Sequence, residues 1–577
     1  MRRTALLSAS LLVCSLALGS SKSSVKKPVD NSATVLPAAA QSAMKLINPE
    51  RIRAHVKFLS SDLLEGRGTG QRGGDIAADY IATEFALFGL KPAGDNGSYF
   101  QRVPMVGIAT EAPSTVTLTA GGGQPLSLRL GDDIVAMDET QNATSKIDSD
   151  LVFVGYGIDA PEYNWNDFKD VNVAGKVLLV LVNEPPSDDP NFFKGKALTY
   201  YGRWTYKYEE AARKGAVGAI IIHKTDMASY GWDVVKNSWG GERSYLRSDG
   251  DPKLKLAAWV QLDIAKAALA AVGKDLDALM EQARSRDFRP IPLPVRVEST
   301  ISSKIRPFES SNVVALLPGS EPKFKQQAVI YSAHYDHLGI HPGQAGDNIY
   351  NGAIDNATGC GILLELAYAF ANSSQPPKRS ILFAAVTAEE QGLRGSEYLG
   401  RRPPVPAGDI ALGLNFDGVA PRGIPEDVEV SGAERTSFYP VVKATAKEFG
   451  LDIKPDSNPG AGHYYRSDHF SFARVGIPAF SINEGMKFKG HPIDYGFQLE
   501  KEYTDQNYHQ PSDEYHAEWD FTGVAEIARF GFELGWKAAS STELTAWLPG
   551  DEFETARKAS LKNVAEEPDR TNAGATK

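Results

Sequence analysis

The stretch of sequence that decides the fold is residues 328–337, which read Ala-Val-Ile-Tyr-Ser-Ala-His-Tyr-Asp-His. The apolar run at its start is typical of a strand buried on both faces, as the parallel strands of α/β sheets are. His334 and Asp336 follow where this strand ends, and side chains two residues apart on an extended segment point to the same side. We therefore expect this strand to present polar, chemically useful groups at its carboxyl end.

The chain around this strand alternates apolar strands with amphipathic helices, and it shows no internal repeat. This alternation predicts an α/β fold, with a sheet flanked by helices on both faces and a ligand crevice at the carboxyl ends of the strands. The strands are expected at residues 312–317, 328–332, 380–386, 410–415, 428–430 and 479–482, and the helices at residues 358–371, 434–449 and 521–539.

Two further regions precede this sheet. Residues 48–90 have apolar positions three to four residues apart, typical of helices. A glycine-rich loop at residues 65–70 interrupts them, but it lacks the Lys-Ser/Thr pair of a phosphate-binding loop. Farther on, a separate mixed β/α module is indicated by short apolar strands at residues 116–119, 126–130, 151–154, 176–182 and 218–222.

The N-terminal end has the pattern of a secretory signal at residues 1–19. Arg2 and Arg3 precede an apolar stretch too short to span a membrane comfortably. A lipid anchor at Cys14 would need a small residue where Val13 stands, so we expect none. The protein is therefore expected to be exported, to the periplasm or to the medium.

The rest of the chain divides into a linker, a two-part body with an inserted module, and a tail. We expect a flexible linker at residues 20–45, rich in Ser, Ala and Lys, and a polar tail at residues 546–577. Between them, the α/β body is expected to comprise residues 46–104 and 305–545, with the β/α module at residues 105–304 inserted into it.

Composition excludes some classes of partner and ligand. The 577 residues carry 61 Lys and Arg against 72 Asp and Glu, a formal net charge of −11, and this acidic balance argues against a nucleic-acid partner. No segment after the leader approaches the apolar length of a transmembrane helix. The two cysteines are Cys14 and Cys360, so the mature chain cannot form an internal disulfide.

Acidic residues and histidines fall in five short segments, three of which follow predicted strands. Imidazole and carboxylate groups are ligands that Zn²⁺ takes in proteins. Two such ions held close together repel each other, and a shared carboxylate, with one further carboxylate and one imidazole on each ion, offsets that repulsion. Five side chains supply this set: His334, Asp355, Glu390, Asp417 and His509.

Two neighbouring acids complete this hypothesis. Asp336 is placed to accept the second imidazole N–H of His334 and so to fix its tautomer. Glu389 is available to take a proton if Glu390 binds metal. Each residue also has an ordinary structural explanation, since Asp355 could be a helix N-cap and Asp417 could belong to a turn. The order of all five segments, rather than any one of them, favours the metal site.

The series His-x-Asp, Asp-Asn-Ala-Thr-Gly, Glu-Glu-x-Gly, Asn-x-Asp and Tyr-His resembles the co-catalytic zinc aminopeptidases of metallopeptidase family twenty-eight. The resemblance covers roughly residues 46–104 and 305–545 and implies a zinc-exopeptidase-type mixed sheet. Residues 105–304 resemble, more weakly, the protease-associated domain that a subset of this family carries. The implied cofactor is two Zn²⁺ per chain, and the implied substrates are peptides with a free N-terminus.

The resemblance also implies a role for each residue of the series. One zinc would take His334 and Asp417, the other Glu390 and His509, and Asp355 would bridge them. Glu389 would be the general base toward a water that bridges the metals. Asp336 would orient His334, Tyr508 would donate to the oxyanion, and the peptide bond between Asp355 and Asn356 would be cis.

Three other functions stay open at this point. A carboxypeptidase or dipeptidase on the same scaffold would need basic side chains that read a substrate carboxylate, for which Arg394 and Arg466 are candidates. A cyclase acting on N-terminal glutamine would use a one-zinc variant of the fold, which the complete ligand series argues against. A non-catalytic binding protein that works through the protease-associated domain would not need the Glu389-Glu390 pair. His337 and His341, which follow the first ligand, are available for substrate contacts, although a structural role is favoured for both.

Overall fold

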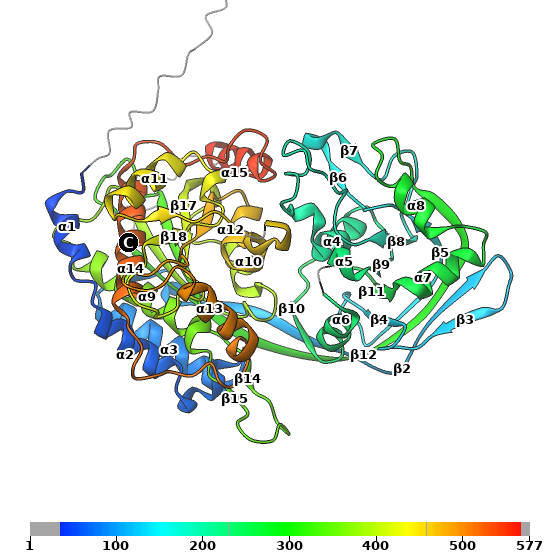
Figure 1. Cartoon of the computed structure of the whole chain (residues 1–577), viewed down its shortest axis with the longest axis horizontal. Coiled ribbons are helices and arrows are strands. Elements are labelled where there is room, and N and C mark those ends of the chain that lie inside the picture. The colour runs from blue at the N-terminus through cyan, green and yellow to red at the C-terminus, as the bar shows by residue number, and fades with distance from the viewer. Residues whose placement is uncertain (1–34, 229, 457–458, 567–577) are drawn as a thin grey trace, which may run out of the picture.

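The computed structural model describes residues 35–228, 230–456 and 459–566, which form two lobes that share one sheet (Figure 1). The signal sequence predicted at residues 1–19 lies outside the described residues. The sheet has fourteen strands, and its main path runs β20-β17-β13-β16-β12-β5-β8-β9-β11-β4. Within the described ranges, no helix combines the length and the apolar character needed to cross a membrane.

The first lobe contains the strands β20-β17-β13-β16-β12. β13 is parallel to both of its neighbours, β17 is parallel to β20, and β12 is antiparallel to β16. The observed bounds are β12 Ile291–Leu317, β13 Ala328–His334, β16 Ser380–Val386, β17 Ile410–Asn415 and β20 Ala479–Ser481. The predicted α/β fold is confirmed, and the bounds predicted for β16 and β17 coincide with the observed ones.

Side chains along β13 alternate between the two faces of the sheet, so both faces are apolar and helices cover each of them. Val329, Tyr331 and Ala333 pack in the larger core with α2, α3, α9 and α14, and Ile330 packs in a smaller core with α10 and α12. The bounds are α2 Pro49–Leu59, α3 Arg72–Leu87, α9 Gly359–Ala371, α10 Arg394–Arg401, α12 His469–Arg474 and α14 Thr522–Ser540. The strand predicted at 428–430 and the helix predicted at 434–449 are observed as β18 Asp427–Glu429 and α11 Tyr439–Glu448.

The second lobe has its own cores on the two sides of the other half of the sheet. β5, β8, β9 and β11 are mutually parallel, and β4 closes this end antiparallel to β11. Helices α7 and α8 pack on one side, and α4 and α6 contribute to the other. The bounds are β4 Ile134–Met137, β5 Thr144–Phe153, β8 Val177–Leu181, β9 Gly218–His223, β11 Leu256–Gln261, α4 Trp204–Arg213, α6 Trp232–Trp239, α7 Leu262–Ala270 and α8 Leu276–Gln282.

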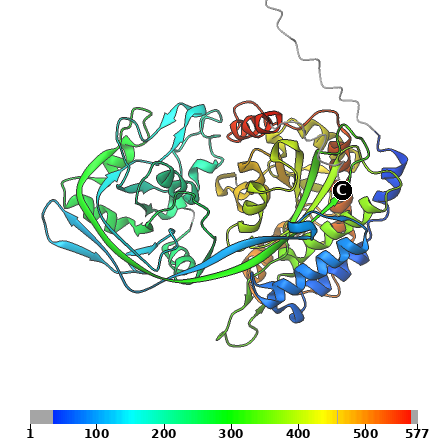
Figure 2. The same cartoon turned by 180° about the vertical axis from the view of Figure 1, so that it is seen from behind.

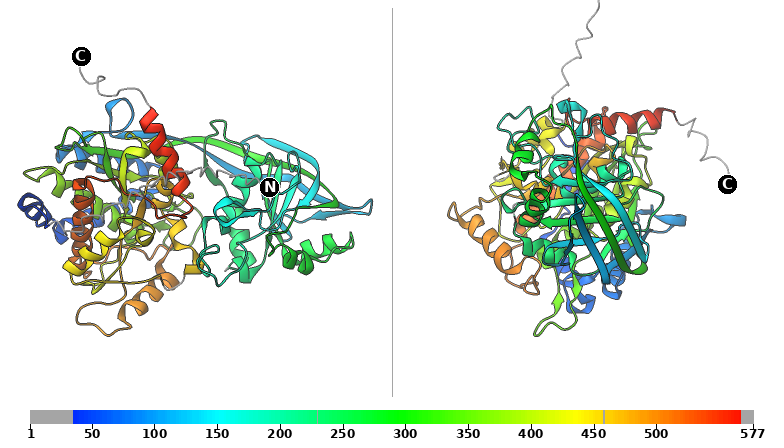
Figure 3. Two further views of the ribbon diagram at one scale, coloured as in Figure 1. Left: turned by 90° about the horizontal axis from the view of Figure 1, so that it is seen from above. Right: turned by 90° about the vertical axis from the view of Figure 1, so that its right-hand side faces the viewer.

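Two long strands run through both lobes. β2 (Phe100–Ala120) and β12 pair antiparallel, from Phe100 opposite Val313 to Ala120 opposite Val295. Figures 2 and 3 show this two-stranded ribbon continuing from one lobe into the other. The boundaries expected at residues 104–105 and 304–305 fall inside these strands. Only the apolar ends of these strands can be recognised in the sequence. The middle of β2 has no apolar pattern, because residues 111–113 are exposed.

The segment predicted as a flexible linker contains a packed helix. Residues 38–44 form α1 (Ala38–Met44), in which Ala40 and Ala43 are buried. α1 lies against α9 and α14, and the small alanine side chains allow this close approach. The linker prediction is therefore wrong for residues 38–44, because burial against the core stabilises a helix that is too short to be stable alone.

The segment predicted as a polar tail is also packed. It contains α15 (Glu554–Glu566), and Trp547 and Phe553 before this helix are buried in one cluster with Tyr464 and Tyr465. Residues 547–566 of the predicted polar tail are therefore an ordered part of the body. Two aromatic anchors in an otherwise charged segment are enough to attach it to the core.

This C-terminal segment also connects the two lobes through the buried carboxylate of Glu552. In the first lobe, Arg435 Nη2 and Tyr465 Oη each donate to Glu552 at 2.6 Å. From the second lobe, the main-chain N–H of Tyr200 donates to it at 2.9 Å, and Lys194 Nζ lies 3.2 Å from the neighbouring Asp551. The side chain of Glu552 is only 2% exposed, so water cannot replace these partners.

We predict that Glu552→Ala weakens the contact between the lobes by about 3 kcal/mol, because it leaves buried donors and one charge without their acceptor. Thermal denaturation should show a lowered midpoint, and limited proteolysis should show faster cleavage around residues 194–203. The control is Glu543→Ala, because Glu543 is exposed and its replacement should change stability by about 0.5 kcal/mol or less. Equal denaturation midpoints for the two variants would contradict the role of Glu552.

Candidate metal centre

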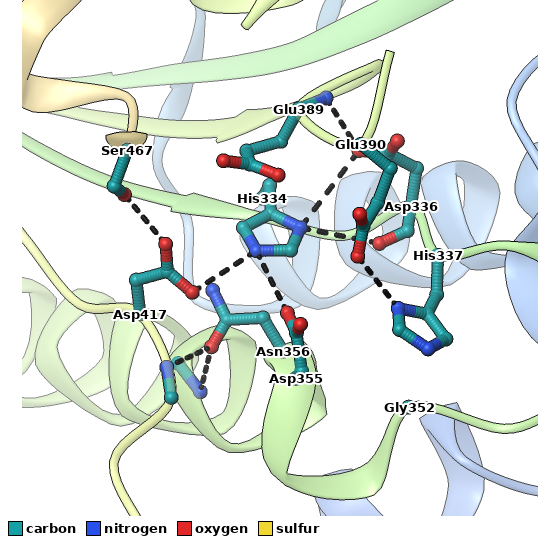
Figure 4. Close-up of polar contacts among 12 residues, drawn as sticks. His334, Asp336, His337, Gly352, Asp355, Asn356, Glu389, Glu390, Asp417 and Ser467 are labelled. Carbon is teal, nitrogen blue, oxygen red and sulfur yellow. Dashed lines mark hydrogen bonds and ion pairs between the residues drawn. The ribbon is translucent and has the colours of Figure 1, made fainter. Parts of the chain in front are cut away.

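The five predicted metal ligands lie together at the carboxyl edge of the first lobe's strands. Figure 4 shows four of them, His334, Asp355, Glu390 and Asp417. His334 ends β13, Glu390 follows β16 and Asp417 follows β17, so the parallel strands bring three of them to one edge. Asp355 comes from residues 353–358, which precede α9, and His509 follows the helical turn at residues 503–507.

The five side chains form two triads that share Asp355. In the first triad, His334 Nε2 lies 3.2 Å from Asp355 Oδ1 and 3.1 Å from Asp417 Oδ1. In the second, His509 Nε2 lies 3.3 Å from Asp355 Oδ2 and 3.2 Å from Glu390 Oε2. Each oxygen of Asp355 therefore belongs to a different triad, as a bridging carboxylate requires.

These spacings and donor types fit zinc. Tetrahedral zinc with bonds of about 2.0–2.1 Å to nitrogen and oxygen places its ligand atoms about 3.3 Å apart. The four distances measured to the two imidazoles agree with that edge length within a few tenths of an ångström. Each triad offers two carboxylate oxygens and one imidazole nitrogen and leaves a fourth position for water or substrate.

The electrostatics of the cluster favour added positive charge. Burial works against ionisation of Asp355, but hydrogen bonds from His334 and His509 outweigh it and hold the pKa of this carboxyl well below its usual range. Burial alone would lower the pKa of His334, but the negative charges of Asp417 and Glu389 raise it well above its usual value. Carboxylates gathered away from water need a compensating cation, which protons on the imidazoles supply only in part.

Main-chain contacts position the bridging residue. The carboxylate of Asp513 accepts the N–H groups of Ile354 at 3.0 Å and Asp355 at 3.1 Å. The peptide bond between Asp355 and Asn356 is cis, as the resemblance implied. Asn356 then links this segment to the next ligand loop, because its Oδ1 accepts the N–H of Gly418 at 3.2 Å. Asp513 was not among the predicted site residues, since a single acid in a loop carries no distinguishing signal.

Asp336 contacts His334 in a different way from the one expected. The main-chain carbonyl of Asp336 lies 3.2 Å from His334 Nδ1, whereas its carboxylate is 3.9 Å away. The carboxylate instead accepts the hydroxyl of Thr69 at 2.9 Å and the N–H of Glu389 at 3.1 Å. Asp336 thus fixes the imidazole through its backbone and fixes the loop of the Glu389-Glu390 pair through its side chain.

Glu389 and Tyr508 adjoin the two triads. Desolvation raises the pKa of Glu389 well above its usual range, and the nearby carboxylates of Glu390 and Asp417 add to this effect. Such a group is suited to accept and release a proton near neutral pH. The ring of Tyr508 stacks on that of His509 at 3.9 Å between centroids, and Tyr508 is 48% exposed.

Two contacts from outside the predicted set hold predicted metal ligands. Ser467 Oγ donates to Asp417 Oδ2 at 2.5 Å, which leaves Asp417 Oδ1 for the first triad. His337 Nδ1 lies 2.8 Å from Glu390 Oε1, the oxygen that faces away from the second triad. Sequence reasoning treated His337 as a neighbour of the first ligand loop and did not connect it to Glu390.

Part of this chain is similar to a known protein family and to curated proteins. Residues 312–530, which include all five predicted ligands, match the sequence profile described as Peptidase family M28. A "Probable zinc metalloprotease" of Pyrenophora teres f. teres is 36% identical over 114 residues, or 20% of this chain and 23% of the relative. "Leupeptin-inactivating enzyme 1" of Streptomyces exfoliatus is 27% identical over 186 residues, or 31% of this chain and 36% of the relative. This chain therefore spans only about a quarter to a third of the length of these two curated relatives.

Two solved structures are similar at low sequence identity. The aminopeptidase from Aneurinibacillus sp. strain AM-1 is 18% identical and has a TM-score of 0.47, over 88% of this chain and 97% of that one. A zinc aminopeptidase from Bacillus subtilis is 16% identical and has a TM-score of 0.39, over 85% of this chain and 95% of that one.

We predict that Asp513→Asn weakens zinc binding about 10- to 100-fold, because Asn keeps only one acceptor oxygen and turns an NH2 group toward one of the two N–H groups that now hold the Asp355 segment. The measurement is calorimetric titration of the metal-free protein with Zn²⁺. Asp505→Asn is the matched control, since Asp505 is exposed and its side chain pairs with Lys501, away from the predicted ligands. Unchanged affinity in Asp513→Asn would show that this carboxylate does not position the ligand.

Proposed function

We propose, from the premise that residues 312–530 form a domain of peptidase family M28, that this protein is an exported di-zinc metallo-aminopeptidase that removes N-terminal residues from peptides. The observation that carries the proposal is the pair of triads sharing Asp355, with distances of 3.1–3.3 Å from each imidazole to its carboxylates. This arrangement supplies five protein ligands for two ions, which is the number such a centre needs.

In this proposal each residue of the centre has one task. Zinc bound there would act as a Lewis acid and would lower the pKa of a bound water from about 15.7 toward about 7. The ligands of one ion would be His334, Asp355 and Asp417, and those of the other would be Asp355, Glu390 and His509.

The proton transfers are assigned to Glu389. Its carboxylate accepts a proton from the water as the water oxygen bonds to the scissile carbonyl carbon. It then donates that proton to the amine nitrogen as the carbon–nitrogen bond breaks, so the carboxylate is regenerated. The hydroxyl of Tyr508 donates to the carbonyl oxygen as negative charge develops, and such a donor contributes about 3–4 kcal/mol.

Selection for a free N-terminus follows from the charge of the site. The carboxylates of Asp355, Glu390 and Glu389 attract a protonated or metal-bound amine and disfavour a second carboxylate nearby. Of the two arginines that a carboxypeptidase could use, Arg394 is already engaged by Glu397 at 3.1 Å and lies over the ring of Tyr245. This engagement makes Arg394 a poor partner for a substrate carboxylate, and Arg466 donates to the main-chain carbonyl of Ala461 at 2.9 Å.

We assign the second lobe to a protease-associated domain inserted into the peptidase, and we propose that it narrows the cleft so that short peptides are preferred. Its contacts with the first lobe support this role, because Arg474 of α12 pairs with Glu209 of α4 at 2.8 Å. Export is proposed from the signal pattern at residues 1–19, with release into the periplasm or the medium.

Replacement of Glu389 by Gln tests the proton transfers. Glu389→Gln should lower kcat by about 10²- to 10⁴-fold while both zinc ions stay bound, because the residue contributes a proton acceptor but no metal bond. Elemental analysis and steady-state kinetics measure the two effects separately. Glu518→Gln, an exposed replacement of the same kind, should leave both unchanged. Near-normal turnover in Glu389→Gln would remove Glu389 from the mechanism.

Metal removal tests the activity itself. We expect hydrolysis of an amino-acid p-nitroanilide to be lost on chelation and to return with two equivalents of Zn²⁺ per chain. The same substrate with its amine acetylated should not be cleaved, because the blocked amine can no longer be bound. Cleavage of the blocked substrate, or activity that survives complete chelation, would refute the aminopeptidase assignment.

A further inference from the structure

A third imidazole lies inside the metal centre without belonging to either proposed ligand triad. His337 is fully buried, and its Nδ1 lies 2.8 Å from Glu390 Oε1, whose own side chain is 4% exposed (Figure 4). The ligand-type atoms of His337, Asp355 and Glu390 all lie within 4.8 Å of one another. His337 is therefore close enough to the second triad to influence it.

The two oxygens of Glu390 have different partners. Oε2 faces His509 Nε2 at 3.2 Å and belongs to the triad, whereas Oε1 faces His337 Nδ1. A carboxylate whose oxygens were both free could turn and bind a metal through either oxygen or through both. The contact with His337 ties up one oxygen, so that Glu390 presents a single oxygen to the second metal position.

The backbone of His337 is held by the glycine-rich loop at residues 65–70. The main-chain N–H of His337 donates to the carbonyl of Arg67 at 3.2 Å, and Gly68 pairs with His337 as an isolated bridge. The guanidinium of Arg67 is 1% exposed and donates to four main-chain carbonyls: those of Leu59, Tyr335, Asn351 and Gly352. One arginine thus ties the loop before His337 to the loop before Asp355.

The ring of His337 is confined on its other side by Gly352. A Cβ at Gly352 would lie 2.6 Å from the ring carbons, and the φ angle of 55° at this position is also one that favours glycine. His337 Nε2 is buried and has no hydrogen-bond partner among the residues that the structure describes. A histidine with a purely structural role would be expected to satisfy both ring nitrogens, whereas in the described part of the chain the ring of His337 has one hydrogen-bond partner, Glu390.

We propose that His337 is a positioning residue for the second metal: its Nδ1–H donates to Glu390 Oε1 and holds Glu390 as a one-oxygen ligand. The inference rests on the proposed di-zinc function and extends it to a residue outside the ligand set. Partners of this kind, which orient a ligand without touching the metal, typically change metal affinity about 10- to 100-fold. The affected ion is the one held by Glu390 and His509, and the ion held by His334 and Asp417 should be little changed.

The test compares zinc binding by the full-length protein carrying His337→Ala, His337→Asn or His341→Ala. Calorimetric titration of each metal-free protein with Zn²⁺ resolves the two binding steps. His337→Ala should weaken one step about 10- to 100-fold and leave the other within about threefold. His337→Asn should recover most of the zinc affinity that His337→Ala loses, because the amide Nδ2 of Asn can donate from nearly the position of the imidazole Nδ1. His341 packs against the ring of Tyr350 and is exposed, so His341→Ala should match the wild type.

Each outcome has a defined meaning. Equal zinc affinities in His337→Ala and the wild type would overturn the inference and leave the proposed function intact. An asparagine variant as weak as the alanine variant would also overturn it, since a direct metal bond from the imidazole would then be the better explanation. A wild-type protein that binds fewer than two zinc ions would overturn both the inference and the proposed function. Circular dichroism of the metal-free variants identifies any loss of affinity caused by misfolding.

Discussion

The structure depends on holding several carboxylates close together in a place that water hardly reaches. Asp355, Glu390 and Asp417 would repel one another, and the two imidazoles of His334 and His509 between them relieve that repulsion only in part. Such a cluster is stable only if the backbone fixes its members and a cation completes it. The parallel strands of the first lobe provide the fixed positions, because their carboxyl ends meet at one edge of the sheet.

The groups that orient these ligands are mostly backbone amides and carbonyls. Asp513 is held by two N–H groups, Asn356 by the main chain of residues 416–418, and Arg67 by four carbonyls. Main-chain partners of this kind lose little conformational entropy on ordering, so they position a ligand more rigidly than flexible charged side chains would. The rigidity of the centre is therefore spread over several loops.

Sequence reasoning succeeded where the signal is local and periodic. The apolar runs of β13, β16 and β17 mark buried strands, and the acids and histidines that follow them converge as expected. It failed where a residue's role depends on a distant partner. α15 has a largely polar sequence and owes its place to Trp547 and Phe553, and Asp513 is recognisable only once it faces the N–H groups of Ile354 and Asp355. The sequence predicts only short strands, at residues 116–119 and 312–317, where the structure has the long strands β2 and β12. The exposed middle of β2 lacks the apolar pattern that would have predicted a longer strand.

The continuity of β2 and β12 constrains how the molecule can deform and evolve. Eighteen residues of β12, from Val295 to Val313, have paired partners in β2, so the lobes are joined by a stiff two-stranded beam in place of a loose tether. Any rotation of one lobe relative to the other must bend or twist this ribbon. The ribbon therefore favours small elastic movements of the lobes over a wide separation of them. Deleting the second lobe at the domain boundaries expected from the sequence would interrupt both strands. It would also expose an unpaired sheet edge, which is a surface prone to aggregation. The two lobes are thus obliged to persist together as one mechanical unit.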